Sequence, residues 1–471
     1  MTHYLSVDLG ATSGRTVLAT FDNGRINMRE FTRFDNPQIP VGGHLYWDLA
    51  HLYNEVLKAL RKVAAEGLKL SSIGIDTWGC DVAFFGSDGQ LLGMPYCYRD
   101  SHTDKAMDRY FADAMSAHEV YRRTGIQFMP FNTLFQLYTM RSNSSSSLAA
   151  ASKILFIPDA LIYMLTGETV CEQTVASTSQ MLNADTGDLD EELLATLGLS
   201  RQQFGRLVKP GETVGRLTAQ VQDATGVADI PIVAVGSHDT ASAVAAVPAA
   251  DANYAYLSCG TWSLLGIESQ QPIITEESFR ENFTNEGGLD GTTRFLKNIC
   301  GLWLYEQCRK EWTDVPQNVN DLNALCLTSS CQSLLNPDDP RLAHPVSMTA
   351  AIREVLAETG QTLPKTPADY VRVIFRSLAA RYVEVVGLLR QLSDIDIRRL
   401  HVIGGGSRNQ FLMQFAADAL KMPVIAGPTE GTALGNALLQ VRADGLVSSL
   451  TEMRAIIARS IELIRYEPRQ D

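Results

Sequence analysis

The sequence lacks the patterns by which cysteines usually bind metals or form a disulfide framework. Its eight cysteines are scattered, none forms a C-x-x-C motif, and none completes a zinc-type spacing with histidine. Free thiols in a reducing compartment are therefore expected. The eight positions are Cys80, Cys97, Cys171, Cys259, Cys300, Cys308, Cys326 and Cys331.

Long apolar runs and an excess of positive charge are also missing. No uncharged apolar stretch reaches the roughly 18 residues that a membrane span needs, and the first residues show no basic and apolar leader. The formal net charge of −13 argues against a nucleic-acid or anionic-membrane surface. We therefore expect a cytoplasmic protein whose partners are small molecules, present as a monomer or a homo-dimer.

The length and the periodicity indicate two α/β domains. A chain of 471 residues suits two large domains, and strands alternate with helices such as those expected over 49–65 and 370–392. The order strand, small-residue turn, strand occurs near the start of both halves, over 4–21 and 254–267. A helix of small residues ends at Pro248, which predicts domains 1–247 and 248–471. The serine-rich stretch 141–152 is expected to be a mobile surface connection.

The segment from Asp8 to Arg15 joins two expected strands through a turn of small residues. Such a turn lets backbone N–H groups approach an anion closely, and Thr12 and Ser13 add hydroxyl donors. Asp8, at the end of the strand, suits a Mg²⁺ ion held beside phosphates. A tight hairpin without a ligand explains the same pattern equally well.

Asp239 is expected in the first turn of a helix that follows a buried strand. Phosphoryl transfer to a sugar hydroxyl needs a carboxylate that accepts the proton, and Asp239 is placed for that role. A helix cap is the alternative, because Ser, Asp and Thr are common at helix starts. Two further small-residue turns, Gly260-Thr261 and Gly404-Gly405-Gly406, follow strands in the second half and could meet phosphates or adenosine.

Together these segments resemble the FGGY family of carbohydrate kinases, in the superfamily of actin, hexokinase and the heat-shock-chaperone ATPases. The resemblance covers nearly the whole chain and is carried by 7–15, 73–81, 125–134, 237–244, 260–263, 282–288, 296–298 and 404–409. It implies two ribonuclease H-like domains with the active site in a central cleft. Within the family, the Thr-Trp-Gly segment at 77–79 and the Gly-Ile-Gln-Phe segment at 125–128 look specific to kinases of L-rhamnulose.

The resemblance also implies roles for individual residues. The expected reaction converts L-rhamnulose and ATP to L-rhamnulose 1-phosphate and ADP with Mg²⁺, with Asp239 as the general base and Asp8 at the metal. Glu306 stands where the related kinases carry Gln near the nucleotide. Expected nucleotide contacts are Ala11, Thr12, Ser13, Gly14, Arg15, Thr261, Glu306 and Gly405, and expected sugar contacts are Gly79, His238, Asp239, Thr240 and Asn298.

Other functions remain open at the level of sequence. A kinase of L-fuculose, xylulose or glycerol would use the same fold, and contacts around Trp78, Asp81 and Asn132 would decide among them. An ATP-switched chaperone or filament protein is a different class, but no all-β peptide-binding segment with a helical lid follows the second domain. A catalytically inactive sugar sensor is a third alternative, which the presence of both Asp8 and Asp239 disfavours.

Overall fold

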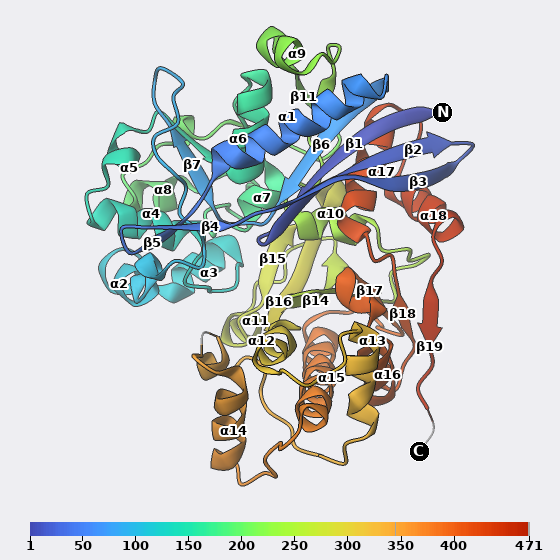
Figure 1. Cartoon of the computed structure of the whole chain (residues 1–471). Helices are drawn as coiled ribbons and strands as arrows, with labels where there is room; N and C mark the ends of the chain where they lie inside the picture. The colour runs from blue at the N-terminus through green and yellow to red at the C-terminus, as the bar shows by residue number, and fades with distance from the viewer. Residues whose placement is uncertain (344, 470–471) are drawn as a thin grey trace. The chain divides into compact units, whose positions relative to one another are not determined.

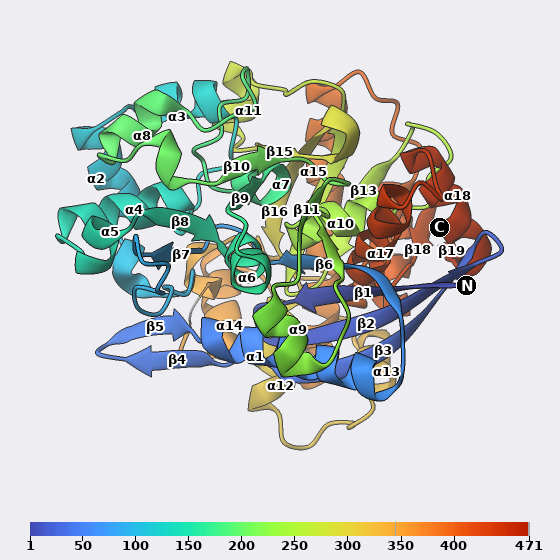
Figure 2. The same cartoon turned by 90° about the horizontal axis from the view of Figure 1, so that it is seen from above.

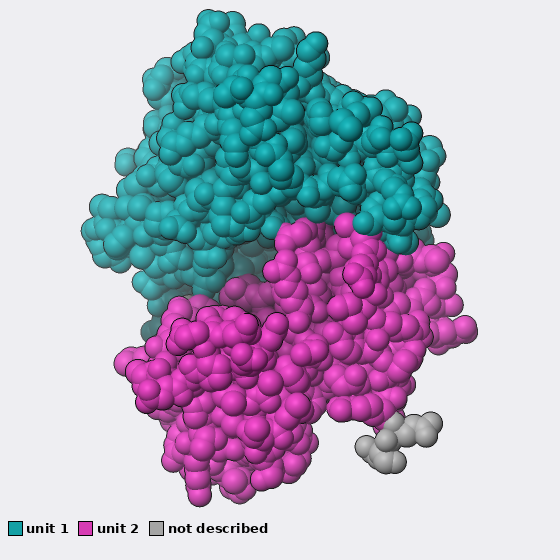
Figure 3. All heavy atoms as spheres, turned by 45° about the vertical axis from the view of Figure 1, so that its right-hand side comes forward, with its two compact units in different colours: residues 1–246, 269–295, 432–460 teal, residues 247–268, 296–431, 461–471 magenta. Residues whose placement is uncertain are grey.

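The computed structural model describes residues 1–343 and 345–469. Contacts divide the chain into two compact units, each built from three segments (Figure 3). Unit 1 contains residues 1–246, 269–295 and 432–460, and unit 2 contains residues 247–268, 296–431 and 461–471. The sequence-based boundary lies beside the first change of unit but did not anticipate the two later segments. The division into 1–247 and 248–471 therefore stays a prediction.

A six-stranded mixed sheet forms the centre of unit 1, in the order β11-β12-β6-β1-β2-β3. Strand β1 pairs antiparallel with β2 and parallel with β6, and β12 continues the sheet parallel to β6. The expected alternation of strands and helices is thus observed. The strand bounds are β1 (Thr2–Leu9), β2 (Ser13–Asp22), β3 (Arg25–Asp35), β6 (Leu70–Thr77), β11 (Thr213–Arg216) and β12 (Pro231–Val233).

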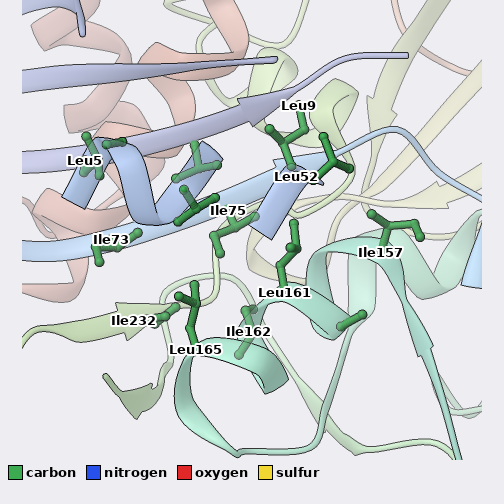
Figure 4. Packing of buried hydrophobic residues seen from close by; sticks show 14 of the residues in the cluster. Leu5, Leu9, Leu52, Ile73, Ile75, Ile157, Leu161, Ile162, Leu165 and Ile232 are labelled. Atoms are coloured by element: carbon green, nitrogen blue, oxygen red, sulfur yellow. The ribbon is translucent and has the colours of Figure 1, made fainter. Parts of the chain in front are cut away.

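One face of this sheet carries the apolar core of unit 1. Alternate residues along a strand point to the same face, so Leu5 and Leu9 of β1 and Ile73 and Ile75 of β6 lie together (Figure 4). They pack against helices α1 (Leu49–Ala65) and α6 (Ile157–Thr166), while α9 (Ala219–Thr225) supplies Val221 to the same cluster. The helix predicted over 49–65 is confirmed.

The opposite face carries small and polar residues, and helices from the far end of the sequence cover it. The Tyr4 hydroxyl donates to Asp444 at 2.8 Å across 440 sequence positions, and the Ser6 hydroxyl donates to the Ala433 carbonyl at 3.1 Å. Figures 1 and 2 show these helices, α17 (Gly431–Ala443) and α18 (Leu450–Ser460), beside the blue strands. Gly74 permits this approach, because a Cβ there would lie 2.8 Å from Gln440 Nε2.

A second apolar cluster of unit 1 lies among residues 82–204. It includes the antiparallel pair β7 and β8 and several short helices. The serine-rich stretch lies largely at the surface, as expected, and contains helical turns: α4 continues to Ser142, and the Ser145 hydroxyl accepts from Leu148 N at the start of α5. Bounds here are β7 (Val82–Phe85), α2 (Ala106–Asp113), α3 (Ala117–Thr124), α4 (Thr133–Ser142), α5 (Ser146–Ala150), β8 (Lys153–Phe156), β9 (Val170–Glu172), α7 (Gln173–Ser177), α8 (Glu191–Thr196) and β10 (Arg206–Val208).

The second large sheet has seven strands in the order β15-β16-β14-β13-β17-β18-β19. Long helix α15 (Pro367–Leu392) and helix α16 (Gln410–Leu420) belong to unit 2 and pack on each other. The strand expected over 399–403 is observed as β17. The remaining bounds are β13 (Ala255–Cys259), β14 (Trp262–Ser269), β15 (Thr284–Gly287), β16 (Thr293–Cys300), β17 (Leu400–Ile403), β18 (Val424–Ala426), β19 (Ile464–Tyr466), α12 (Trp303–Glu311), α13 (Val319–Ala324) and α14 (Met348–Glu358).

The two sheets repeat one strand arrangement. In both, a strand pairs antiparallel with its successor across a tight turn and parallel with a strand much later in the sequence: β1 with β2 and β6, and β13 with β14 and β17. This is the repetition that the sequence suggested. Within the described ranges, none of the helices combines the length and apolar character that a membrane crossing requires. All eight cysteines are free thiols, as expected.

Candidate active site

The turn between β1 and β2 is held by a buried asparagine. Gly10 N donates to the Ser13 carbonyl at 3.0 Å, which closes the turn. Asn36, only 2% exposed, donates from its side chain to the Gly10 carbonyl at 2.9 Å and from its backbone to the Thr12 carbonyl at 3.1 Å. Asn36 therefore satisfies the Gly10 and Thr12 carbonyls by hydrogen bonds. Ala11 and Thr12 remain at least partly accessible to solvent at the tip of the turn.

Arg15 lies against Asp8 rather than pointing into solvent. Its Nε and Nη2 atoms donate to Asp8 Oδ2 at 2.9 and 2.7 Å, a charge-assisted contact between two mostly buried side chains. The guanidinium therefore compensates the charge of the predicted metal ligand. Gly14 is closely packed in this hairpin, because a Cβ there would overlap the Phe34 ring and would lie 2.9 Å from Leu9 Cδ2.

A second carboxylate, which the sequence analysis did not select, stands beside Asp8. Asp8 and Asp76 are partners in the parallel pairing of β1 and β6, so both side chains leave the sheet on the polar face. Asp76 is fully buried, and its Oδ1 has no hydrogen-bond partner in the described part of the chain. Burial raises the pKa of Asp76 well above its ordinary value, and the nearby charges of Asp8 and Asp239 raise it further. The charges of Asp8 and Asp239 therefore both act on Asp76.

Helix α17 holds Asp76 in place. Asn436 donates to Asp76 Oδ2 at 2.5 Å, and Gln440, one helical turn later, donates to Asn436 Oδ1 at 2.7 Å. The same helix packs tightly on α10 (Asp239–Ala245), because a Cβ on Gly435 would overlap the Ser242 carbonyl oxygen. The C-terminal segment thus positions both Asp76 and the helix that begins with Asp239.

Asp239 begins α10 directly after an extended segment that joins the sheet. Thr77 N donates to the Ser237 carbonyl at 2.9 Å, which ties this segment to the end of β6. Ser237 N in turn donates to Glu172 Oε2 at 3.2 Å. The Asp239 side chain is about one-third exposed, and Thr240 Oγ1 donates to its Oδ1 at 3.0 Å. A partly accessible carboxylate on a well-fixed backbone suits proton transfer.

Glu172 is a further buried acid that sequence reasoning missed. It accepts from Thr174 N, Thr174 Oγ1, Val175 N and Ser237 N at 2.6–3.2 Å. Burial nevertheless raises its pKa to about 7, because those hydrogen bonds offset only part of the desolvation. In the sequence, Glu172 resembles an ordinary N-cap, because it directly precedes α7. Nothing in the sequence indicates that its side chain also accepts a hydrogen bond from Ser237 N.

Gly79 lies in a tightly packed part of unit 1. A Cβ on Gly79 would lie 2.7 Å from Thr178 Oγ1, so only glycine fits. Trp78 is 6% exposed, and its Nε1 donates to Asp81 Oδ2 at 2.8 Å. Asp81 also accepts from Trp47 Nε1 at 2.6 Å. Burial raises the pKa of Asp81 to about 6, although these hydrogen bonds lower it. Asp81 therefore orients two indole rings.

The turn between β13 and β14 in unit 2 is built like its counterpart but carries no acid. Gly260 N donates to the Trp262 carbonyl at 2.8 Å, and Gly301 N donates to the Thr261 carbonyl at 3.1 Å. Thr261 is exposed at the tip. Glu306 lies on α12, is about half exposed, and has Arg309 at 3.6 Å as a charge partner. Arg309 thus provides a cation beside this negative charge.

The three glycines after β17 have different surroundings. Gly404 adopts φ +84°, and a Cβ on Gly406 would overlap Cys259 Sγ, so both are required by the fold. Gly405 is exposed, and a Cβ there would meet nothing within 4 Å. Of the three, Gly405 is therefore the one with room for a ligand beside its backbone. Asn298, the predicted sugar contact in β16, is half-buried and also belongs to unit 2.

The structure thus brings some predicted residues together within unit 1. Asp8 pairs with Asp76 in the sheet, Asp239 lies near enough to raise the pKa of Asp76, and His238 and Thr240 flank Asp239 in the sequence. Thr261, Asn298, Glu306 and Gly405 lie in unit 2. One sequence pattern could have identified Asp76. The tetrapeptide Ile-Gly-Ile-Asp lies near the end of β6, as Leu-Ser-Val-Asp, which contains Asp8, lies near the end of β1.

Comparisons with known proteins agree with this architecture. The model of the FGGY family of carbohydrate kinases, N-terminal domain, matches residues 3–246, and that of the C-terminal domain matches residues 255–443. The structure of gluconate kinase from Lactobacillus acidophilus superposes with a TM-score of 0.83 at 18% identity, covering 99% of this chain and 94% of that one. The expected two-domain α/β fold is confirmed.

Sequence relatives extend over the full chain. Rhamnulokinase of Bacteroides thetaiotaomicron is 52% identical over 99% of this chain and 96% of the relative. Rhamnulokinase of Pectobacterium carotovorum is 43% identical over 99% of this chain and 93% of the relative. The chain therefore belongs to the FGGY family of carbohydrate kinases, whose members transfer a phosphoryl group from ATP to a sugar.

Proposed function

We propose that the protein phosphorylates L-rhamnulose at its 1-hydroxyl group, with ATP as the donor and Mg²⁺ as the metal. The proposal of L-rhamnulose as the substrate rests on the 52% identity to a rhamnulokinase over 99% of the chain. Similarity of this extent supports a shared substrate, whereas fold alone would not distinguish among sugar kinases.

Asp239 is the proposed general base. Its carboxylate accepts the proton of the attacking hydroxyl while the new oxygen–phosphorus bond forms, and the bond between the γ-phosphorus and the bridging oxygen breaks to release ADP. Partial exposure leaves this carboxylate reachable, and Thr240 fixes one of its oxygens. Gly79, His238, Thr240 and Asn298 are the proposed sugar contacts.

Asp8 and Asp76 fit a Mg²⁺ ion that is held mainly by phosphates and water. Mg²⁺ in kinases usually takes only one or two carboxylates from the protein, and no cluster of three or more metal-binding side chains occurs among the residues described. The unpartnered Oδ1 of Asp76 is a suitable hard ligand. When bound, the ion neutralises charge that develops on the phosphates.

The nucleotide contacts are proposed for the exposed tips of the two turns. In unit 1 the segment Ala11–Arg15 offers backbone N–H groups and hydroxyls, and Asn36 keeps its carbonyls occupied. In unit 2 Thr261 and Gly405 are exposed. Glu306 is proposed near the nucleotide on the family pattern, with its charge offset by Arg309.

The preference for a 6-deoxy sugar is proposed to come from an aromatic group. Trp78 lies 4.3 Å from Trp47, Trp47 lies 6.3 Å from Tyr98, and Tyr98 lies 5.3 Å from Phe131, measured between ring centroids. A methyl contact in an apolar pocket contributes about 1–3 kcal/mol, so discrimination should be roughly 10–200-fold.

An ADP-release assay over a panel of acceptors tests this function. We expect L-rhamnulose to give the highest kcat/KM, ahead of L-fuculose, D-xylulose and glycerol. A preference for xylulose or glycerol would overturn the substrate while leaving the kinase activity intact. Fast ATP hydrolysis without any acceptor would contradict the mechanism itself.

A further inference from the structure

The connection between strand β12 and Asp239 is irregular but buried. Strand β12 ends at Val233, and α10 begins at Asp239. The two residues directly before Asp239, Ser237 and His238, are 0% and 8% exposed. A buried backbone N–H group outside a helix needs a partner from elsewhere in the fold, because leaving it unpaired is costly. The partners of these two N–H groups therefore fix the main chain from which Asp239 projects.

Helix α7 and the residue that caps it provide both partners. Ser237 N donates to Glu172 Oε2 at 3.2 Å. His238 N donates to Thr174 Oγ1 at 3.1 Å. A backbone N–H group only donates, so the direction of both bonds is the same whether Glu172 is charged or protonated. Two consecutive N–H groups are thus held from one short stretch of chain.

The two accepting side chains are themselves joined and anchored. Thr174 Oγ1 lies within hydrogen-bond distance of Glu172 Oε2, at 2.6 Å, and both residues are 0% exposed. Glu172 N donates to the buried carboxylate of Asp159 on α6, at 3.2 and 3.3 Å from its two oxygens. The support therefore runs from α6 through Glu172 and Thr174 to the main chain at residue 238.

Capping of α7 explains only part of this arrangement. A cap requires the bonds that Glu172 accepts from Thr174 N and Val175 N. The bonds from residues 237 and 238 span 65 and 64 positions of sequence and add nothing to the cap. They hold the segment before α10, whose Ser237 carbonyl also accepts from Thr77 N at 2.9 Å. This segment is thus tied both to α7 and to the end of β6.

We propose that Thr174 is a positioning residue for phosphoryl transfer: with Glu172 behind it, its hydroxyl fixes the main chain from which the Asp239 carboxylate projects. This inference rests on the proposed role of Asp239 as the general base. Because Thr174 is fully buried, it acts through that carboxylate rather than by contact with the sugar. A displacement of a catalytic group by about 1 Å can lower the rate roughly 10²-fold, so the support of this segment matters for turnover.

Hydrogen–deuterium exchange followed by mass spectrometry tests the support without any turnover. Thr174→Val removes the hydroxyl but keeps the shape of the side chain. The peptide that contains His238 should then exchange roughly fivefold faster, the factor that corresponds to one lost hydrogen bond. Thr174→Ser retains the hydroxyl and should exchange as the unchanged protein does. Equal exchange of this peptide in all three proteins would overturn the proposal.

Kinetics separate positioning from a purely structural role. Thr174→Val should lower kcat roughly 10–10²-fold with the KM for ATP unchanged, and Thr174→Ser should restore most of the turnover. The matched control is Thr225→Val, which removes a buried hydroxyl that donates to the Val221 carbonyl at 2.6 Å in α9 of the same unit. It should lower the free energy of unfolding but leave kcat unchanged. An equal loss of kcat in Thr225→Val would show a general effect of destabilisation and contradict positioning.

A double variant tests whether Thr174 acts through the base. In the Asp239→Asn background, Thr174→Val should cost almost nothing further, because the group that it positions is already lost. Equal losses in both backgrounds would contradict the proposal. Full activity in Asp239→Asn would refute the base itself and with it this role, whereas faster exchange in Thr174→Val would still show that Thr174 holds the main chain.

A second substitution keeps the test decisive if Thr174→Val does not fold. The isosteric Glu172→Gln replaces one accepting oxygen by an amide that donates. It should speed exchange of the same peptide and lower kcat in the same direction. Unchanged exchange together with unchanged kcat in Glu172→Gln would refute the proposal.

Discussion

The two sheets share a strand arrangement but differ in the residues at the same register. In unit 1, Asp8 of β1 lies opposite Asp76 of β6, and in the second sheet Ser258 of β13 lies opposite Ile403 of β17. Each pair lies within one residue of the end of its strands. One sheet thus brings two carboxylates together where the other brings a hydroxyl and an apolar side chain.

Electrostatics follow the same division. The acids with raised pKa values, Asp76, Asp81, Asp159 and Glu172, all lie in unit 1, and burial is the first cause for each. In the described part of unit 2, the shifted acids move the other way, as Glu311 and Asp369 do through hydrogen bonds that outweigh their burial. The difference teaches that two sheets with one strand arrangement can differ in their buried acids, since the acids with raised pKa values lie in unit 1 although both units carry a small-residue turn.

The sharpest test of this division between the units is the replacement of Asp239, the proposed general base. Asp239→Asn should lower kcat by roughly 10²–10⁴-fold, the usual contribution of acid–base catalysis, while sugar and ATP still bind. ADP release and calorimetric titration measure both quantities. Asp223→Asn, an exposed change in α9 of the same unit, is the control and should behave as the unchanged protein. Wild-type turnover in Asp239→Asn would show that Asp239 is not the general base.

The next largest effect is expected at the metal. Asp8→Asn should weaken Mn²⁺ binding in the presence of ADP by about 100-fold, since even outer partners of metal sites cost 10–100-fold. Electron paramagnetic resonance of Mn²⁺ reports binding without turnover. Sugar affinity should be unchanged. If the Mn²⁺ titrations of Asp8→Asn and the unchanged protein superimpose, Asp8 does not contribute to metal binding.

A smaller effect distinguishes the glycines of unit 2. Gly406→Ala places a Cβ against Cys259 Sγ and should lower the free energy of unfolding by about 1–3 kcal/mol, as overpacking does. Gly405→Ala meets open space and should leave stability unchanged while raising the KM for ATP. Chemical denaturation and steady-state kinetics check the two outcomes. Equal destabilisation by both variants would contradict the assignment.

The smallest effect is a dependence of stability on pH. Because the folded-state pKa of Glu172 is raised from 4.5 to about 7, the folded state binds more protons between these values. The free energy of unfolding should therefore fall as pH rises from 5 to 7, by at most about 1.4 kcal/mol per pH unit for this group. Glu172→Gln should be less stable but should show a shallower slope. Urea denaturation across this range measures it, and identical slopes would contradict the raised pKa.

Much of the fold could be predicted because its signals are local. The 3.6-residue period of α1 and the alternation in β1 appear in short windows of sequence. The turn at Gly10 was recognisable for the same reason. In the serine-rich stretch, by contrast, composition gave no sign that Ser145 caps a helix.

The sequence by itself determined the family, the strand and turn order, and the choice of Asp8 and Asp239, because each depends on residues close together in the chain. Only the tertiary structure revealed the partners of those acids. Asn436 reaches Asp76 across 360 positions, and Arg294 reaches His238 across 56. Pairings of that separation leave no local pattern, since they arise only when helices and strands pack and buried polar groups must find partners. The long-range partners of Asp76 and Arg294 are therefore visible only in the folded chain.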